Sequence, residues 1–396
     1  MRMSFLGDIM LPMDQLEQYK SNNEYDFYPA VAAIAKEFKE SDIVIANLET
    51  PIAGKQMEYT FERYSFNSPI DLPKALRKVG ITMVTTANNH CLDRGTEGLI
   101  RTIKNLHECD MEIIGTHAER EKSYVIKEIN GIKIGLLAFT YGTNAFSNRN
   151  YLENDQKYMV DLLQGQELSH PLVRHFWLSN HRPIRYMRAV ARRLHIGQFD
   201  KQVYERREKD KAEIQNYRNA VMECRNDGVD YIVACLHIGG QYNEHPTDYT
   251  KKICQLSRQL GVNAVIANHE HVIHGIDTEH LSDTSFCIYS LGNFLSSTGV
   301  TREPYDKLAQ YSVAVNIDLD KDKNGKLKAA YTFEIFCNCS KGKSKVVSEP
   351  LIDCIMRCAD ADMKEKLIRD YNNLMNRICN TEGKDYPLQR EYALKI

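Results

Sequence analysis

The sequence lacks several features that would assign it to a specialised class of protein. No apolar run in its 396 residues approaches the roughly 18 residues that cross a bilayer, so no membrane-spanning helix is expected. Residues 1–6 run straight into an apolar strand, without the basic start and long apolar core of a secretory leader, so we expect no signal peptide. Internal repeats and low-complexity linkers are absent, and the net charge of −2 shows no overall preference for an anionic or a cationic partner.

The eleven cysteines include no Cys-x-x-Cys pair, which removes the common zinc and redox motifs. Most of them occur in apolar strands, where a free thiol behaves as a small hydrophobic side chain. We interpret Cys337 and Cys339, and likewise Cys354 and Cys358, as incidental rather than as metal sites. The odd and scattered set therefore predicts free thiols and a reducing cytoplasm.

Strand and helix patterns alternate before residue 141 and again after residue 211, which predicts an α/β core. Strands are expected at 3–6, 43–46, 82–87, 112–114, 231–237, 264–267, 287–291, 311–317 and 329–337, and helices at 28–40, 72–79, 95–108, 212–226, 248–260 and 361–378. Asn130-Gly131 predicts the tight turn of a hairpin formed by 123–130 and 131–140. We expect one domain over 1–396, with a C-terminal helical extension at 361–396.

The alternation breaks down at 143–211, which is expected to form a helical basic insertion. From His170 onward the segment holds eleven Lys and Arg residues against four Asp and Glu, a charge of +7, and the chain's one tryptophan, Trp177. Basic residues beside an aromatic edge can lie on an anionic membrane or attract an anionic polymer. The alternative is that the segment forms solvent-exposed helices that lie over the core and bind no partner. Peripheral contact of 170–211 with an anionic membrane is therefore a hypothesis.

Polar residues with metal-binding chemistry follow five of the expected strands. They are Asp8, Glu49, Asn89, His237, His269 and His271. The carboxyl ends of neighbouring strands meet at one edge of an α/β sheet, so we expect these side chains to converge. Each alone has a structural explanation, such as turn capping, and their joint occurrence is what predicts a site. Carboxylate, amide and imidazole ligands favour Mn²⁺, Fe or Zn²⁺, and a carboxylate can bridge two such ions.

Six ordered segments resemble the successive motifs of the bacterial capsule-synthesis CapA family. They are residues 5–11 (FLGDIML), 47–51 (NLETP), 87–95 (ANNHCLDRG), 236–239 (LHIG), 269–272 (HEHV) and 289–294 (YSLGNF). The resemblance covers roughly 1–141 and 212–315. It implies the calcineurin-like metallophosphoesterase fold, a four-layer α/β/β/α sandwich, and work in the biosynthesis of a poly-γ-glutamate type of capsule or cell-surface polymer.

The resemblance also implies a site with two divalent metal ions, Mn, Fe or Zn, and with Glu49 as the bridge between them. The ligands that it implies are Asp8 and His271 for the first ion and Asn89, His237 and His269 for the second. Met10 stands where the superfamily usually has a histidine ligand, so weak occupancy of the first position is expected.

Catalytic and substrate-binding roles follow from the same resemblance. His90 would face the substrate and protonate the leaving oxygen, with Asp93 as its orienting partner. The alternative for Asp93 is an N-cap of the following helix. The expected substrate contacts are Asn88, Tyr289 and Asn293.

Two functions stay open at this point. The first is a two-metal-dependent hydrolase or phosphoesterase that uses metal-activated water on an anionic polymer or phosphoester. The second is a non-catalytic polymer-binding or capsule-assembly factor that retains the fold. Met10 favours the second, and so does Gln241, which replaces the family's usual glutamate. The intact Asn89-His90 pair favours the first. No nucleic-acid partner is expected, because the chain has no nucleic-acid-binding motif.

Overall fold

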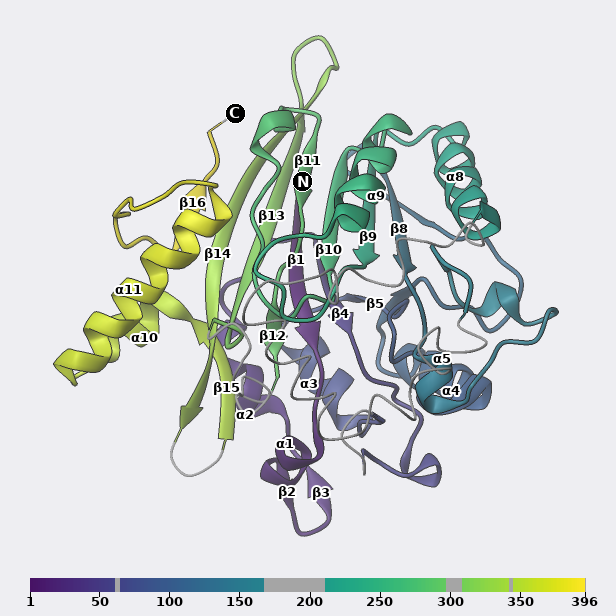
Figure 1. Cartoon of the computed structure of the whole chain (residues 1–396), viewed down its shortest axis with the longest axis horizontal. Coiled ribbons are helices and arrows are strands. Elements are labelled where there is room, and N and C mark those ends of the chain that lie inside the picture. Colours follow the sequence, from purple (N-terminus) through teal and green to yellow (C-terminus); the bar gives the residue numbers. More distant parts are fainter. Residues whose placement is uncertain (61–64, 167–210, 297–307, 342–344, 396) are drawn as a thin grey trace, which may run out of the picture.

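The computed structural model describes residues 1–60, 65–166, 211–296, 308–341 and 345–395, and in them two β-sheets face each other (Figure 1). The larger sheet has the order β15 (Lys345–Pro350), β14 (Leu327–Lys341), β13 (Tyr311–Lys321), β1 (Arg2–Ile9), β4 (Ile43–Leu48), β5 (Met83–Thr85) and β6 (Glu112–Ile114). Two short strands extend it, since β12 (Asn293–Leu295) pairs with β1 and β16 (Glu391–Ala393) pairs with β14.

The smaller sheet has the order β11 (Phe286–Ile288), β10 (Ala264–Asn268), β9 (Tyr231–His237), β8 (Ile132–Thr140) and β7 (Val125–Ile129). Strands β8 to β11 are parallel, and β7 joins β8 as an antiparallel hairpin. The predicted hairpin turn is confirmed, because Asn130 and Gly131 both have positive φ, 53° and 74°. In the larger sheet β1, β4, β5 and β6 are parallel, so their carboxyl ends share one edge.

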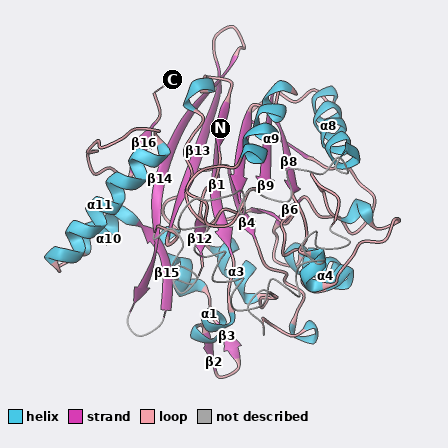
Figure 2. Ribbon diagram, in the orientation of Figure 1, coloured by secondary structure: helices cyan, strands magenta, loops and turns pink. Residues whose placement is uncertain are grey.

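The main hydrophobic core lies between the two sheets. Alternate residues of β1, such as Phe5, pack there with Leu136 of β8 and Val233 of β9. The other face of the larger sheet packs against α1 (Met13–Gln18), α2 (Tyr28–Val31) and α3 (Asp71–Lys78). The outer face of the smaller sheet packs against α8 (Lys211–Asn226) and α9 (Asp248–Gln259) (Figure 2). The expected four-layer α/β/β/α arrangement is therefore confirmed.

Three further helices lie at the edges of this sandwich. Helices α10 (Leu351–Arg357) and α11 (Ala361–Ile378) contribute to the core between the sheets through Leu351 and Leu374. Helix α4 (Gly95–His107) contacts β6. Among the helices that the structure describes, none combines the length and the apolar character that crossing a bilayer requires.

The structure differs from the sequence-based expectations in three segments. The helix expected at 28–40 ends after one turn, because Val31 leaves the helical region at φ −126°, and a 3₁₀ turn follows. The C-terminal segment is a helix as predicted but then adds strand β16. The described part of the insertion, 143–166, holds only α5 (Ala145–Asn148) and a 3₁₀ turn. The basic stretch with Trp177 lies in 167–210, outside the described residues, so its predicted helices and membrane contact are untested.

Candidate metal centre

The predicted ligands converge where β1, β4, β9 and β10 end. All six of them, Asp8, Glu49, Asn89, His237, His269 and His271, are at most 3% exposed. Their donor atoms form two groups whose members lie within 4.8 Å of one another. One group contains Asp8, Glu49 and His237, and the other contains Glu49, His269 and His271. Glu49 belongs to both, as expected of a bridging carboxylate.

The carboxylate of Glu49 is buried among imidazole rings and makes no hydrogen bond with the described residues, as expected of a metal ligand. Its Oε1 atom lies 3.6 Å from Nε2 of His237 and 3.8 Å from Nε2 of His271. Neither carboxylate oxygen makes a hydrogen bond with any residue that the structure describes, although both are buried. A buried carboxylate that accepts no hydrogen bond is costly. Metal–ligand bonds of about 2.1 Å place neighbouring ligand atoms roughly 3–3.5 Å apart, so the Glu49 distances of 3.6 Å and 3.8 Å lie a few tenths of an ångström above the spacing of a filled site.

Asn47 fixes the position of two of these ligands and was not among the predicted site residues. Its Nδ2 group donates to Oδ1 of Asp8 at 2.6 Å and lies 3.2 Å from Nδ1 of His237. Its own carbonyl accepts a hydrogen bond from Thr85 at 3.0 Å. Side chains two residues apart on a strand lie on the same face, so the period-2 relation to Glu49 was the signal in the sequence that could have identified Asn47.

The side-chain carbonyl oxygen of Asn89 lies next to a ring nitrogen of His237. Oδ1 of Asn89 lies 2.7 Å from Nε2 of His237. This agrees with the implied assignment of both residues to one ion. The resemblance also assigns His269 to that ion and His271 to the one at Asp8, whereas the distances group His269 with His271. The division of the imidazoles between two ions therefore stays a prediction.

Asn293, which was predicted as a substrate contact, makes hydrogen bonds with His271, one of the predicted metal ligands. Its Oδ1 atom lies 3.0 Å from Nδ1 of His271, and its Nδ2 group donates to the backbone carbonyls of His271 and Ala309, each at 3.1 Å. Asp8 Oδ2 also lies 3.3 Å from the same Nδ1 atom. Partners of this kind fix the ring orientation of a metal-binding histidine and leave Nε2 for the ion.

The other two predicted substrate contacts lie in different surroundings. Asn88 donates to the carbonyl of Leu48 at 2.8 Å and accepts from the backbone of His90 at 3.1 Å, so it shapes the turn that carries His90. Tyr289 packs with the hydrophobic cluster on the outer face of the smaller sheet, which includes Cys254 of α9. The structure therefore does not bring the ring of Tyr289 to the metal ligands.

The backbone is strained at the two histidines after β10. His269 has φ 100° and His271 has φ 58°, values that residues with a side chain rarely adopt. Such conformations cost of the order of 1–3 kcal/mol each and persist where the surrounding structure enforces them. The strain turns both rings into the cluster, where they lie 5.8 Å apart.

His90 and Asp93 form a buried pair at the rim of the ligand cluster. Nδ1 of His90 lies 2.7 Å from Oδ2 of Asp93, and Nε2 lies 3.9 Å from Glu49 Oε1. Asp93 also accepts hydrogen bonds from the backbone of Phe66, at 2.7 Å, and from the side chain of Asn148. It does not cap α4, whose N-cap position is the next residue and has no side-chain cap. The arrangement leaves Nε2 of His90 as the nitrogen that faces the cluster.

The ionisable side chains of the cluster shift one another's pKa values. Burial opposes ionisation of Glu49, but the neighbouring imidazoles, His271 foremost, hold its pKa below the usual range. Burial lowers the pKa of His271, but Glu49 and Asp8 outweigh it and raise that pKa to about 9. For His90, burial is likewise outweighed by Asp93, so its pKa is raised. The cluster thus attracts positive charge, and binding of metal ions would displace protons from it.

Three aromatic rings that were not predicted as site residues line the cluster. The ring of Tyr141 lies 4.6 Å from that of His269, and the ring of Tyr242 lies 5.4 Å from that of His271. The ring of Phe66 lies 4.5 Å from His90. Nothing in the sequence pattern distinguishes these residues from core aromatics, because they come from loops whose paths the pattern does not give.

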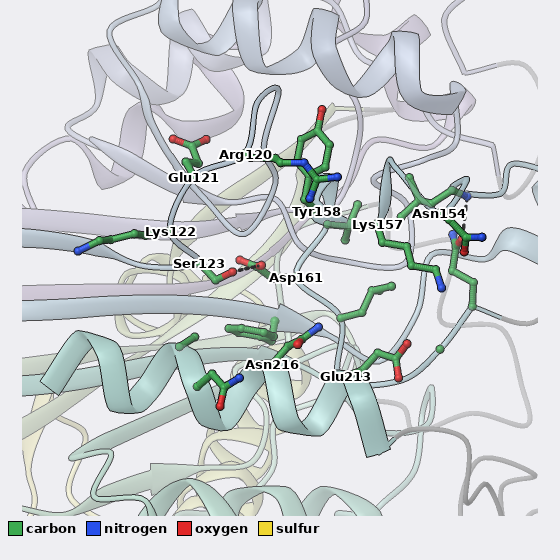
Figure 3. A pocket seen from close by; sticks show the side chains of 18 of the residues that line it. Arg120, Glu121, Lys122, Ser123, Asn154, Lys157, Tyr158, Asp161, Glu213 and Asn216 are labelled. Atoms are coloured by element: carbon green, nitrogen blue, oxygen red, sulfur yellow. Dashed lines mark hydrogen bonds between the residues drawn. The ribbon is translucent and has the colours of Figure 1, made fainter. Parts of the chain in front are cut away.

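A separate cavity of about 790 Å³ opens between α8 and the segments around residues 120 and 158 (Figure 3). Its wall is mainly polar and includes Arg120, Lys157 and Glu213. Ser123 donates to the buried Asp161 at 2.5 Å in this wall. None of the six predicted metal ligands lines the cavity, so it is distinct from the candidate metal centre.

Two facing sheets between helices, with carboxylate, amide and imidazole side chains at the strand ends, define an α/β metallophosphoesterase-like fold. The family model "Bacterial capsule synthesis protein PGA_cap" matches residues 2–298, and the chain belongs to this family.

The relatives of known name agree with this membership. "Capsule biosynthesis protein CapA" from Bacillus anthracis is 23% identical over 319 residues, which cover 79% of this chain and 64% of that protein. "PGA biosynthesis protein CapA" from Bacillus subtilis (strain 168) is 21% identical over 317 residues, which cover 79% of this chain and 68% of that protein. The chain thus spans about two thirds of the length of these relatives.

One similar solved structure is a hypothetical protein from Thermus thermophilus. It covers 84% of this chain and 98% of its own chain at 14% identity, with a TM-score of 0.41. A likeness of this level says nothing about function.

Proposed function

We propose that the chain is a CapA-like, two-metal-dependent hydrolase or phosphoesterase that acts in the biosynthesis of a capsule or cell-surface polymer of the poly-γ-glutamate type. The observation that carries the proposal is Glu49, a buried carboxylate shared by two groups of ligands and without a hydrogen-bond partner among the described residues. Membership of the capsule synthesis family and the names of the CapA relatives support the biological setting.

Asp8, Glu49, Asn89 and the three histidines would hold the two ions. These ligands offer oxygen and nitrogen but no sulfur, which suits Mn²⁺, Fe or Zn²⁺. Bound there, the ions would supply Lewis acidity and an activated water for attack on a phosphorus or carbonyl centre. The low pKa of Glu49 keeps its carboxylate ionised and ready to bind.

His90 would act as the general acid. Asp93 holds Nδ1, so the proton available to a leaving oxygen is the one on Nε2, which faces the cluster. The raised pKa of His90 keeps this proton bound to higher pH than in a free imidazole. A positioned acid of this kind typically contributes about 10²–10⁴-fold in rate. A protein that only binds a polymer has no use for a buried, carboxylate-paired histidine at this point.

The second candidate function is a non-catalytic polymer-binding or capsule-assembly factor. Met10 favours it, because a buried thioether stands where the superfamily usually has a histidine ligand. Gln241, exposed in the loop after β9, removes the carboxylate that the family usually has there. In this case the cluster would stabilise the fold, and neither the native chain nor a His90 variant would show turnover. A cytoplasmic location and contact of 170–211 with an anionic membrane or polymer stay predictions under either function.

Hydrolysis of a generic phosphodiester and a generic phosphomonoester with added Mn²⁺ tests the proposal. The comparison is between the native chain, His90→Gln and His117→Gln. His117 is the matched control, since it is also a buried histidine paired with an aspartate, Asp161, at 3.0 Å, but it lies outside the cluster. Turnover that His90→Gln loses and His117→Gln retains supports the hydrolase. Mn²⁺ binding without turnover in any of the three supports the assembly factor.

A further inference from the structure

We propose that Cys337, Cys339 and Cys354 form a binding site for a single thiophilic cation such as Zn²⁺, separate from the metal centre described above. Their sulfur atoms all lie within 4.8 Å of one another. The sequence spacing alone favoured an incidental role for these cysteines, and their convergence in the fold is what points to a site.

The strand alternation of β14 brings the first two thiols together. Cys337 and Cys339 are two residues apart, so both lie on one face of the strand. Asn338 between them points to the other face, where it donates to the carbonyl of Asn293 at 2.7 Å. The third thiol comes from α10, which packs on the cysteine face of β14 and places Sγ of Cys354 3.0 Å from Sγ of Cys339.

The number of converging thiols suits a metal ion better than a disulfide. Zinc–sulfur bonds of about 2.3 Å in a tetrahedral site place the sulfur atoms roughly 3.8 Å apart, so the 3.0 Å contact between Cys339 and Cys354 would open by about 0.8 Å around an ion. A disulfide joins two thiols and leaves the third without a role. Three convergent thiols are the number that a zinc site with one further oxygen ligand requires.

A carboxylate for the fourth position is close by. Glu349 lies opposite Cys337 in the β14–β15 ladder, so its side chain is on the same face as the thiols. It is buried, and Arg357 of α10 pairs with it at 2.6 Å. Cys337 and Cys354 are buried while Cys339 is half-buried, which gives an ion a route in from the solvent at Cys339.

The consequence of an ion here would be structural. It would tie α10 to β14 near Asn338, which donates to the backbone carbonyl of Asn293 in β12, and Asn293 contacts His271. Cation binding at the thiols would thus stiffen one support of the metal centre. The thiol site itself does not depend on the proposed hydrolase activity.

Co²⁺ is the probe that tests the site, because thiolate-to-cobalt charge-transfer absorption reports sulfur ligands alone and the other centre supplies no thiolate. Under reducing conditions we expect the absorption to appear and to saturate at an intensity that corresponds to one thiolate-bound cobalt ion per chain. It should disappear in Cys339→Ser and Cys354→Ser and persist in Cys379→Ser, a half-buried thiol outside the cluster. Melting curves of the variants establish that each one folds.

Two results would overturn the proposal. One is the absence of charge-transfer absorption in the native chain when its thiols are reduced. The other is absorption that survives in Cys339→Ser and Cys354→Ser. Formation of a Cys339–Cys354 disulfide on mild oxidation, seen as a loss of two hydrogens by mass spectrometry in a chain that binds no Co²⁺, would identify a redox pair in place of a cation site.

Discussion

Replacing Asp93 by asparagine isolates the contribution of the His90–Asp93 pair to catalysis. The side chain keeps its size and can still accept the hydrogen bond from the backbone of Phe66, so the local fold is preserved. The negative charge at 2.7 Å from Nδ1 of His90 is lost. The amide oxygen that takes the place of Oδ2 is a weaker, uncharged acceptor for Nδ1, which lowers the basicity of the ring.

The structure gives both a magnitude and a pH signature for Asp93→Asn. A general acid contributes about 10²–10⁴-fold, so we expect kcat to fall roughly 10²-fold, or about 2.7 kcal/mol in activation free energy, with KM little changed. Burial lowers the pKa of His90 and Asp93 raises it, with a net rise. Without the Asp93 charge the pKa falls, so protonated His90 is lost at lower pH. The alkaline limb of the kcat profile therefore moves to lower pH.

The assay is Mn²⁺-dependent hydrolysis of a chromogenic phosphoester as a function of pH. Asp161→Asn is the matched control, because Asp161 is a buried aspartate 3.0 Å from the Nε2 atom of His117 and lies away from the ligands. It should leave kcat and the pH profile unchanged. Wild-type kcat with an unshifted alkaline limb in a folded Asp93→Asn variant would refute the role of His90 as the acid.

The remaining predictions concern metal binding and stability. Mn²⁺ at a thousandfold excess over its Kd should stabilise the native chain by about 4 kcal/mol and raise its melting temperature. Glu49→Gln should abolish this rise and Glu334→Gln should retain it. Retention in both variants would contradict the bridging role of Glu49. Asn293→Ala should weaken metal affinity roughly 10–100-fold by releasing His271, and chelator competition measures this. Burial raises the pKa of Glu334 to about 8, so the stability that its protonated form contributes should be lost as the pH rises from 4.5 through 8. Urea unfolding of Glu334→Gln should show a weaker fall in stability over this pH range than the native chain shows. Arg390→Ala should lower stability by about 1–3 kcal/mol, since it removes the partner of several carboxylates including Glu334 at 3.5 Å; an unchanged unfolding midpoint would count against this.

The sequence was sufficient to predict the strands that carry the candidate site. Apolar runs that end in a polar residue, such as the one before His237, gave β1, β4, β9 and β10 within a few residues of their observed bounds. The parallel order of β1 and β4 placed Asp8 and Glu49 at one edge of the larger sheet, and that part of the site follows from periodicity and topology. His237 ends β9 of the smaller sheet, so its meeting with them depends on how the two sheets face each other.

The remaining parts depend on contacts that are distant in the sequence. Asn293 reaches His271 only because β12 pairs with β1, and a three-residue strand has too few residues to give a pattern. Tyr289 was placed in the site by its motif, yet its ring packs with the cluster of Cys254 on the far face of the smaller sheet. The thiol site was missed because Cys354 comes from a helix whose packing on β14 the sequence does not reveal.

Elemental analysis of the Cys339→Ser variant, after reconstitution with Mn²⁺ and removal of free ion, tests the central claim most directly. The substitution prevents an ion at the thiols from being counted with those at Glu49. We expect close to two Mn²⁺ ions per chain, with both lost in the further variant Glu49→Gln. A chain that retains no Mn²⁺, and none of Fe²⁺ or Zn²⁺ when these are offered in its place, would contradict the assignment of Glu49 as a bridge between two cations.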